Sequence, residues 1–429
     1  MSSQNRNTVV FVECASAMGG VQFSTLYLAQ SLDRSRWHPI VICPEDGDLP
    51  RACEAAGIET RVVRYPKLRS TSVRVGSSIR LPNLFAWVWN AIALVRAKRA
   101  LQKEFIRTAP DVVVTKGLAS HFIGGLAARA CATPCVWHVQ DLISERSLGV
   151  YRRIFAFGAA RLPRHIIVDG AAIKKQLPSR IHSRVSVIHN GVDTSVFRPG
   201  LDGSAVRREF GIATEQVVIG HVGRITPWKG QHYLIEAFRR IANRYPETVV
   251  LMVGSPVFDH DGYEQRLKSM VAEFGLGQRV KFAGYRHDTP QVLAAMDVLA
   301  FTSIEKDTSP LALLSAMASG LPIVAFDIEG VRELDDTGKV FALARVADVD
   351  ALTESLSSVL SDTSTCEELR QHARAAAERL SLDRYAASID QVLASTCDSA
   401  NDSPIGGRAH ETLTAQDARA VSATANSLN

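Results

Sequence analysis

The segment FTSIEKDTSPLALLSAMASGLPIVAFDIEGVREL, residues 301–334, decides the fold class of this 429-residue chain. An apolar run comes first, and a polar loop with Glu305 and Asp307 follows it. A helical pattern then runs to Gly320, with a proline two residues later, which is typical of a helix end. Another apolar run, 321–327, comes directly afterwards. A strand, a loop, a helix and a strand in this order predict an α/β unit with a parallel sheet.

The same alternation extends over most of the chain. Strands are predicted at 9–14, 38–43, 59–64, 111–115, 134–139, 165–170, 185–190, 217–225, 248–254, 279–285, 297–303 and 321–327. A segment rich in turn residues, 193–204, separates the first seven strands from the last five and is the best linker candidate. Two strand–helix series predict two similar α/β domains that face a cleft.

These patterns give expected boundaries for each part of the chain. The first domain is expected at 1–196 and the second at 205–380. A C-terminal helix at 381–397 can cross back to the first domain. The tail at 398–429 has no aromatic residue and is predicted to be disordered.

The formal net charge of +5 hides an uneven distribution. Residues 61–107 contain eleven Lys or Arg and a single acid, and residues 146–184 contain nine and a single acid. The rest of the chain is therefore net acidic. The basic first half indicates either an anionic partner or solvated helix faces. No recognisable nucleic-acid-binding module accompanies this charge, and we expect no nucleic-acid partner.

The most apolar stretch, residues 81–95, is too short to span a bilayer, which takes about 20 residues. It runs into a cluster of basic residues, so it is either a buried helix with a basic end or a helix at a membrane interface. The polar N-terminus does not resemble a signal peptide. The seven scattered cysteines are typical of reduced thiols, and we expect a cytoplasmic protein. Cys131 and Cys135 have no second Cys/His pair at zinc-site spacing, so no metal is expected.

Several polar residues follow predicted strands, where a doubly wound sheet binds its ligand. Gly19 and Gly20 follow the first strand and would let a ligand approach the backbone. His138 ends the strand 134–139 and is either a hydrogen-bonding group for a substrate hydroxyl or a core histidine. Arg224 and Lys229 share one strand–helix loop, and two cations at a helix N-terminus suit a diphosphate.

The blocks GRITPWKG (223–230), DVLAFTS (297–303) and LLSAMASGLPIVAFDIEGVREL (313–334), together with HNGVD (189–193), carry a family resemblance. The chain resembles the GT-B-fold retaining glycosyltransferases of family 4, also called group 1, over residues 8–395. The resemblance implies two Rossmann-like domains. The N-terminal one would bind the acceptor and the C-terminal one a nucleotide-sugar, which is a co-substrate, so no cofactor and no metal are expected.

By position, the resemblance assigns a role to each matching residue. Arg224 and Lys229 would bind the donor diphosphate. Asp307, at the first acidic place of the Glu-x7-Glu motif, would contact the transferred sugar, and His138 would lie near that sugar on the acceptor side. The further donor-binding residues implied are Gly19, Gly20, Tyr285, Ser309, Pro310, Leu311 and Ser315.

Three of these residues depart from the family pattern. Asp307 is one methylene shorter than glutamate. Ser315 replaces the second acid, and a serine can make only a neutral hydrogen bond to ribose. Pro310 has no N–H to offer a ligand. Glu305 could substitute for Asp307, although it lies two residues out of register.

The predicted function is therefore retaining transfer of a hexosyl group from a nucleoside-diphosphate sugar to a hydroxyl of a glycan or lipid-linked acceptor. We expect a role in cell-surface polysaccharide or glycolipid synthesis. The basic first half favours peripheral attachment to the inner face of the cytoplasmic membrane, through an anionic surface. The alternatives are a nucleotide-sugar epimerase of the same fold and a degenerate, non-catalytic sugar-binding protein. An NAD-dependent dehydrogenase is disfavoured because the three-glycine fingerprint is missing.

Overall fold

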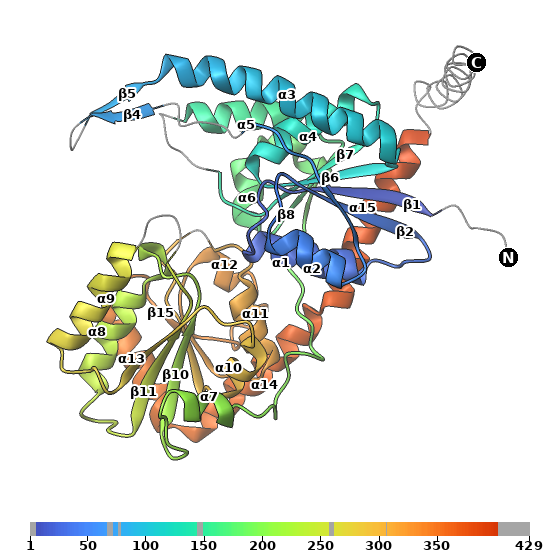
Figure 1. The fold of residues 1–429 in the computed structure, drawn as a ribbon. Coiled ribbons are helices and arrows are strands. Elements are labelled where there is room, and N and C mark those ends of the chain that lie inside the picture. The colour runs from blue at the N-terminus through green and yellow to red at the C-terminus, as the bar shows by residue number, and fades with distance from the viewer. Residues whose placement is uncertain are drawn as a thin grey trace, which may run out of the picture. The chain divides into compact units, whose positions relative to one another are not determined.

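The computed structural model describes residues 6–66, 72–75, 79–143, 149–256, 261–305 and 307–401. The chain divides into two compact units (Figure 1). The first unit consists of Met1–Val168, Lys174–Ile188 and Ala386–Asn429, and the second of Asp169–Ile173 and His189–Tyr385. Both are α/β units built on a parallel sheet, as the alternating pattern predicts.

The sheet of the first unit has seven parallel strands in the order β3-β2-β1-β6-β7-β8-β9. These strands are β1 (Asn7–Val12), β2 (Trp37–Cys43), β3 (Glu59–Val62), β6 (Val112–Lys116), β7 (Cys135–Val139), β8 (His165–Val168) and β9 (Val185–Val187). The α-helices before β9 are α1 (Gly20–Ser31), α2 (Asp48–Ala55), α3 (Leu84–Thr108), α4 (Leu118–Ala130), α5 (Val150–Arg161) and α6 (Ala171–Gln176), and a 3-10 helix, η1 (Ser179–Arg184), precedes that strand. Helices α1 and α2 cover one face of the sheet, and α3, α4 and α5 lie on the other (Figure 1). The central strands are buried on both faces, which explains their continuous apolar sequences.

A short antiparallel hairpin precedes α3 and was not predicted. It consists of β4 (Ser72–Val75) and β5 (Ile79–Pro82). The apolar segment 81–95 therefore begins in a strand and continues into a helix, whose first turn is capped by the Asn83 side chain accepting from the Ala86 N–H at 3.1 Å. No helix in the described ranges is both long and apolar enough to cross a bilayer.

The sheet of the second unit has six parallel strands in the order β12-β11-β10-β13-β14-β15. They are β10 (Val217–Val222), β11 (Thr248–Val253), β12 (Val280–Gly284), β13 (Val298–Phe301), β14 (Ile323–Phe326) and β15 (Ala342–Ala344). The helices are α7 (Ser204–Glu209), η2 (Pro227–Lys229, a 3-10 turn), α8 (Gln231–Ile241), α9 (Asp261–Glu273), α10 (Thr289–Ala294), α11 (Leu311–Ala318), α12 (Glu329–Arg332), α13 (Val349–Ser361) and α14 (Thr363–Arg379). Helices α8, α9 and α13 pack in one apolar core, and α10, α11 and α14 in another on the opposite face of the sheet.

The predicted strands agree with the observed ones to within a few residues, and β15 was missed. Asp169–Ile173, expected in the first domain, belong to the second unit, and the N-terminal part of the first unit ends at Ile188 rather than at residue 196. The physical reason is that Val192 and Phe197 are buried in a core cluster of the second unit. The Val192 N–H also donates to the Leu380 carbonyl at 3.0 Å, which ties this segment to the end of α14.

The last described helix, α15 (Leu382–Asn401), joins the first unit from Ala386 onwards. Its Asp390 accepts hydrogen bonds from Arg36 and from the indole N–H of Trp37, a buried residue of β2. Residues 398–401, expected in the disordered tail, are helical. The remainder of that expected tail, 402–429, lies outside the described residues.

Candidate functional site

Three of the candidate donor residues, Arg224, Lys229 and Asp307, lie where the strand order of the second unit reverses. From β10 the chain adds β11 and β12 on one side, and then returns to add β13 on the other side of β10. The loops after β10 and β13 leave the sheet on either side of this switch point. Ligands of open parallel α/β sheets bind at the carboxyl ends of the strands at such a point. Arg224, Lys229 and Asp307 all lie in these two loops.

The structure joins Lys229 to Asp307. The ammonium group donates to both carboxylate oxygens, at 2.8 and 2.7 Å, and the two side chains are only 10% and 14% exposed. Glu305 is exposed and is not the carboxylate that faces Lys229. An ammonium carries three N–H donors, so this pair leaves the third for a ligand. The pair carries no net charge, but it holds the Lys229 ammonium in a fixed position in a site with little competing water.

The backbone of Lys229 is held in place from two sides. Its carbonyl accepts from the Thr302 hydroxyl at 2.9 Å and from Nε2 of His221 at 3.3 Å. Burial lowers the pKa of His221 to about 4, so this imidazole is neutral near pH 7 and donates from Nε2. Gly230, next in the chain, has φ 67°, and a Cβ there would lie 2.1 Å from the Thr302 carbonyl oxygen. Only glycine allows the two loops to approach this closely.

Arg224 is the more accessible of the two cations. Its side chain is exposed, whereas its carbonyl accepts from the Gln231 amide at 2.8 Å, in the first turn of α8. The Gly230 N-cap opens α8, as predicted, so the helix N-terminus adds a partial positive charge near the two cations.

The start of α11 carries the other predicted donor residues. Pro310 is the N-cap of α11, Leu311 is the first helical residue, and Ser315 lies within the helix with a buried side chain. The Ser309 hydroxyl accepts from the Asn190 N–H at 2.8 Å, and the Ser309 carbonyl accepts from the Asn190 side chain, also at 2.8 Å. The HNGVD segment therefore holds the backbone that leads into α11.

Tyr285 lies apart from this group in the sheet. It follows β12, an edge strand that β11 separates from β10. Half of its surface is exposed, and its ring packs edge-on against His287, with the ring centroids 4.8 Å apart. The described contacts of Tyr285 do not join it to Lys229 or Asp307.

In the first unit, Gly19 and Gly20 begin α1, and His138 lies in β7. His138 is fully buried, in register with Lys116 on the neighbouring β6. A Cβ at Gly20 would meet nothing within 4 Å, so steric crowding by the protein does not require this glycine.

A buried polar cluster beside the Gly19–Gly20 loop was not predicted. Glu13 follows β1, and its carboxylate accepts from the Thr25 hydroxyl and, at 3.1 Å, from the Gln22 amide. Lys116 ends β6 and donates to the Ser24 hydroxyl at 3.1 Å. Burial raises the pKa of Glu13, and the nearby Lys116 charge opposes that rise. The signal available in the sequence was a charged residue at the carboxyl end of each of two otherwise apolar strands.

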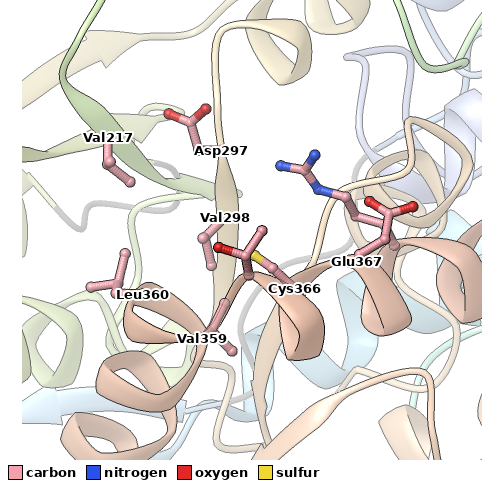
Figure 2. Close-up of a pocket in the computed structure, with 9 residues that line it drawn as sticks. Val217, Asp297, Val298, Val359, Leu360, Cys366 and Glu367 are labelled. Carbon is pink, nitrogen blue, oxygen red and sulfur yellow. The ribbon is translucent and has the colours of Figure 1, made fainter.

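The pocket in Figure 2 is not the candidate donor site. Val217 begins β10 and Val298 begins β13, so this pocket lies at the amino ends of the two strands. Cys366 and Glu367 of α14 also line it (Figure 2). The loops with Lys229 and Asp307 follow the carboxyl ends of the same two strands, at the end of the sheet opposite to this pocket.

Two family models match most of the chain. Residues 18–196 match the model described as Glycosyltransferase Family 4, and residues 203–376 match that of Glycosyl transferases group 1. The chain is 26% identical over 375 residues to an Escherichia coli UDP-Gal:alpha-D-GlcNAc-diphosphoundecaprenol alpha-1,3-galactosyltransferase, covering 84% of this chain and 90% of that protein. It is 30% identical over 210 residues to a Corynebacterium urealyticum D-inositol 3-phosphate glycosyltransferase, covering 48% of this chain and 49% of that protein.

The solved structures agree on the fold. Anabaena HepE, crystallised with UDP and glucose, superposes with a TM-score of 0.76 at 24% identity, covering 90% of this chain and 99% of that one. A glycosyltransferase from Rickettsia africae superposes with a TM-score of 0.73 at 17% identity, covering 91% and 99%. At this identity the likeness establishes the two-domain architecture alone.

Proposed function

The chain belongs to the family-4 glycosyltransferases of GT-B fold, and on that premise we propose that it transfers a hexosyl group from a UDP-sugar to a hydroxyl of a lipid-linked glycan. Its similarity to the Escherichia coli galactosyltransferase, along 90% of that protein, supports this choice of donor and acceptor class. The Lys229–Asp307 pair at the switch point is the structural observation that carries the proposal.

The proposed reaction retains the anomeric configuration of the sugar. The bond between the sugar C1 and the β-phosphate oxygen breaks, a bond from the acceptor oxygen to C1 forms, and the acceptor proton passes to the departing phosphate. Negative charge accumulates on the diphosphate as the first bond breaks. Lys229 and Arg224 would stabilise that charge electrostatically in place of a metal ion, and a positioned donor of this kind is worth about 10²–10³ in rate.

Asp307 has two roles in this scheme. It orients the Lys229 ammonium toward the diphosphate, and its carboxylate oxygens can accept from hydroxyls of the transferred sugar. Ser309, Pro310 and Leu311 bring the N-terminus of α11 to the phosphates, where the free amide of Leu311 can donate. Ser315 would contact the ribose through one neutral hydrogen bond. Tyr285 would contact the nucleotide-sugar at the periphery of the site.

The first unit would bind the acceptor. His138, at the carboxyl end of β7, is proposed to exchange a hydrogen bond with a hydroxyl near the reacting carbon. The Gly19–Gly20 turn would admit a phosphate group to the backbone. Because the proposed acceptor is anchored in lipid, we place the protein at the inner face of the cytoplasmic membrane.

The test is release of nucleoside diphosphate from UDP-, GDP- and ADP-sugars, with and without a polyprenyl-diphosphate-linked sugar. Acceptor-dependent release of UDP supports the proposal. An epimerised donor without UDP release would favour the epimerase, and no binding of any donor would favour a non-catalytic protein. Lys229→Ala should lower turnover about 10²–10³-fold. Lys268→Ala is the matched control, because this lysine pairs with Glu264 on the surface of α9.

A further inference from the structure

The outer face of α3 presents large apolar side chains to solvent. Phe85, Val88, Ile92 and Val95 are all exposed, Val88 by 62% and Ile92 by 46%. Their spacing of three, four and three residues puts them on one face of the helix. The buried positions over the same turns, Ala86 and Ala93, are small. This is the reverse of the usual arrangement, in which large apolar residues of a surface helix point into the core.

Helix α5 contributes a second set of the same kind. Ile154 and Phe157 are 51% and 60% exposed. Both helices pack on α4, α3 directly and α5 through the ring contact between Phe122 and Phe155. Figure 1 shows the three helices on the same side of the first unit's sheet. We call Phe85, Val88, Ile92, Val95, Ile154 and Phe157 the α3–α5 surface.

Positive charge accompanies the α3–α5 surface. Past Val95, the exposed residues of α3 include Arg96, Arg99, Lys103 and Arg107, and those of α5 include Arg152, Arg153 and Arg161. Glu104 is the one acid of α3 and is already paired with Arg107 at 2.7 Å. The guanidinium of Arg161 lies 3.8 Å from the Phe157 ring centroid, which places a cation directly over an exposed aromatic ring.

We propose that the α3–α5 surface docks the protein on an anionic phospholipid bilayer. The apolar side chains would enter the boundary between headgroups and acyl chains, and the arginines and lysines would contact the lipid phosphates. A second copy of the chain is a poorer occupant. A symmetric dimer through this surface would bring together the cations of α3 and α5 from both copies, and Glu104 is the one acid within these two helices. The inference rests on the proposed lipid-linked acceptor, since docking would bring the enzyme to a substrate held in the membrane.

The experiment is sedimentation of the full-length protein with phosphatidylcholine vesicles that contain about 0–40% phosphatidylglycerol. This series varies the negative surface charge to which polybasic segments respond. No sugar donor or acceptor is present. The expected result is binding that rises with the phosphatidylglycerol fraction and falls with added salt. Val88→Ser/Ile92→Ser should weaken binding at least tenfold, given about fourfold per methylene removed from the interface. Arg99→Gln/Lys103→Gln should weaken it about 25-fold, and the salt dependence should become shallower.

The matched control is Val196→Ser/Leu343→Ser, which alters two exposed apolar residues of the second unit. This variant should bind vesicles like the unaltered protein. Equal binding by the α3 variant and the control would overturn the proposal, as would no sedimentation with vesicles of any composition. Concentration-dependent dimers that are lost in Val88→Ser/Ile92→Ser would assign the surface to self-association instead. Vesicle binding without UDP release would refute the proposed function and leave the docking inference standing.

Discussion

Lys229 and Asp307 form a bidentate ion pair, with Nζ 2.8 and 2.7 Å from the two carboxylate oxygens, although 78 residues separate them in the chain. The pair links the loop after β10 to the loop after β13, the two segments that flank the switch point of the second sheet. It therefore couples the stability of the donor-binding unit to its proposed catalysis.

Asp307→Asn should damage both stability and activity. The substitution leaves the Lys229 ammonium, 10% exposed, without its counterion, and breaking such a pair costs about 3–5 kcal/mol. Thermal unfolding and the rate of UDP release measure the two effects. Asp307→Glu keeps the charge and should retain most of the stability. Asp350→Asn is the control, because Asp350 pairs with Arg240 on the surface with its side chain 86% exposed, where a pair is worth about 0–1 kcal/mol. Equal losses in Asp307→Asn and Asp350→Asn would contradict the role assigned to the pair.

Ser315→Glu should strengthen donor binding and lower the stability of the ligand-free protein. A carboxylate can accept charge-assisted hydrogen bonds from ribose hydroxyls, which are worth about 1.5–3 kcal/mol against about 1 kcal/mol for a neutral bond. Without ligand, the new charge is buried in the middle of α11 and lowers the melting temperature. Calorimetric titration with UDP should show roughly tenfold tighter binding. Ser315→Gln, similar in size but neutral, should not give this gain. If it does, ribose binding is not limited by the missing charge.

Gly230→Ala should be more harmful than a typical glycine substitution. The added Cβ would lie 2.1 Å from the Thr302 carbonyl oxygen, so the two loops at the switch point must separate. Gly275→Ala is a close control, because Gly275 has nearly the same φ, 68° against 67°, but open space around its Cβ position. The control should lose about 1 kcal/mol of unfolding free energy, from backbone strain alone. Gly230→Ala should lose more and should also bind UDP more weakly. Identical behaviour of the two variants would mean that the close approach is unimportant.

Glu13→Gln should change how stability depends on pH. Burial raises the pKa of Glu13 in the folded protein above its ordinary value of 4.5. The native state therefore holds this proton more tightly than the unfolded state, so the contribution of Glu13 is full below about pH 4.5 and is lost as the pH rises through the raised pKa. Glutamine does not titrate. The stability difference between the unaltered protein and Glu13→Gln, measured by urea unfolding from pH 4.5 to 7.5, should therefore shift in favour of the variant as pH rises. A pH-independent difference would contradict the raised pKa.

The amino-acid sequence by itself determined the α/β class, the donor motifs and twelve of the strands of this chain, but not β4, β5 or β15. Apolar runs, glycine-terminated helices and the GRITPWKG block are local patterns. They can be recognised in the sequence without knowing which strands are neighbours in the sheet. The assignment of Arg224, Lys229 and Asp307 to one donor site rested on the resemblance to the family-4 glycosyltransferases, and the strand-end rule is consistent with it.

Tertiary structure alone decided which of these residues touch. Asp307 rather than Glu305 faces Lys229, and the same two loops approach each other closely where Gly230 meets the Thr302 carbonyl. Packing also decided that Glu13 and Lys116 are buried beside α1, and that the first half of α3 turns Phe85, Val88, Ile92 and Val95 outward while Leu101 and Phe105 are buried. The outward face could not be read from composition. An apolar helix of this length has the same sequence pattern whether its apolar face packs on the protein core or faces a partner outside the protein. Only the neighbouring elements determine which face is covered.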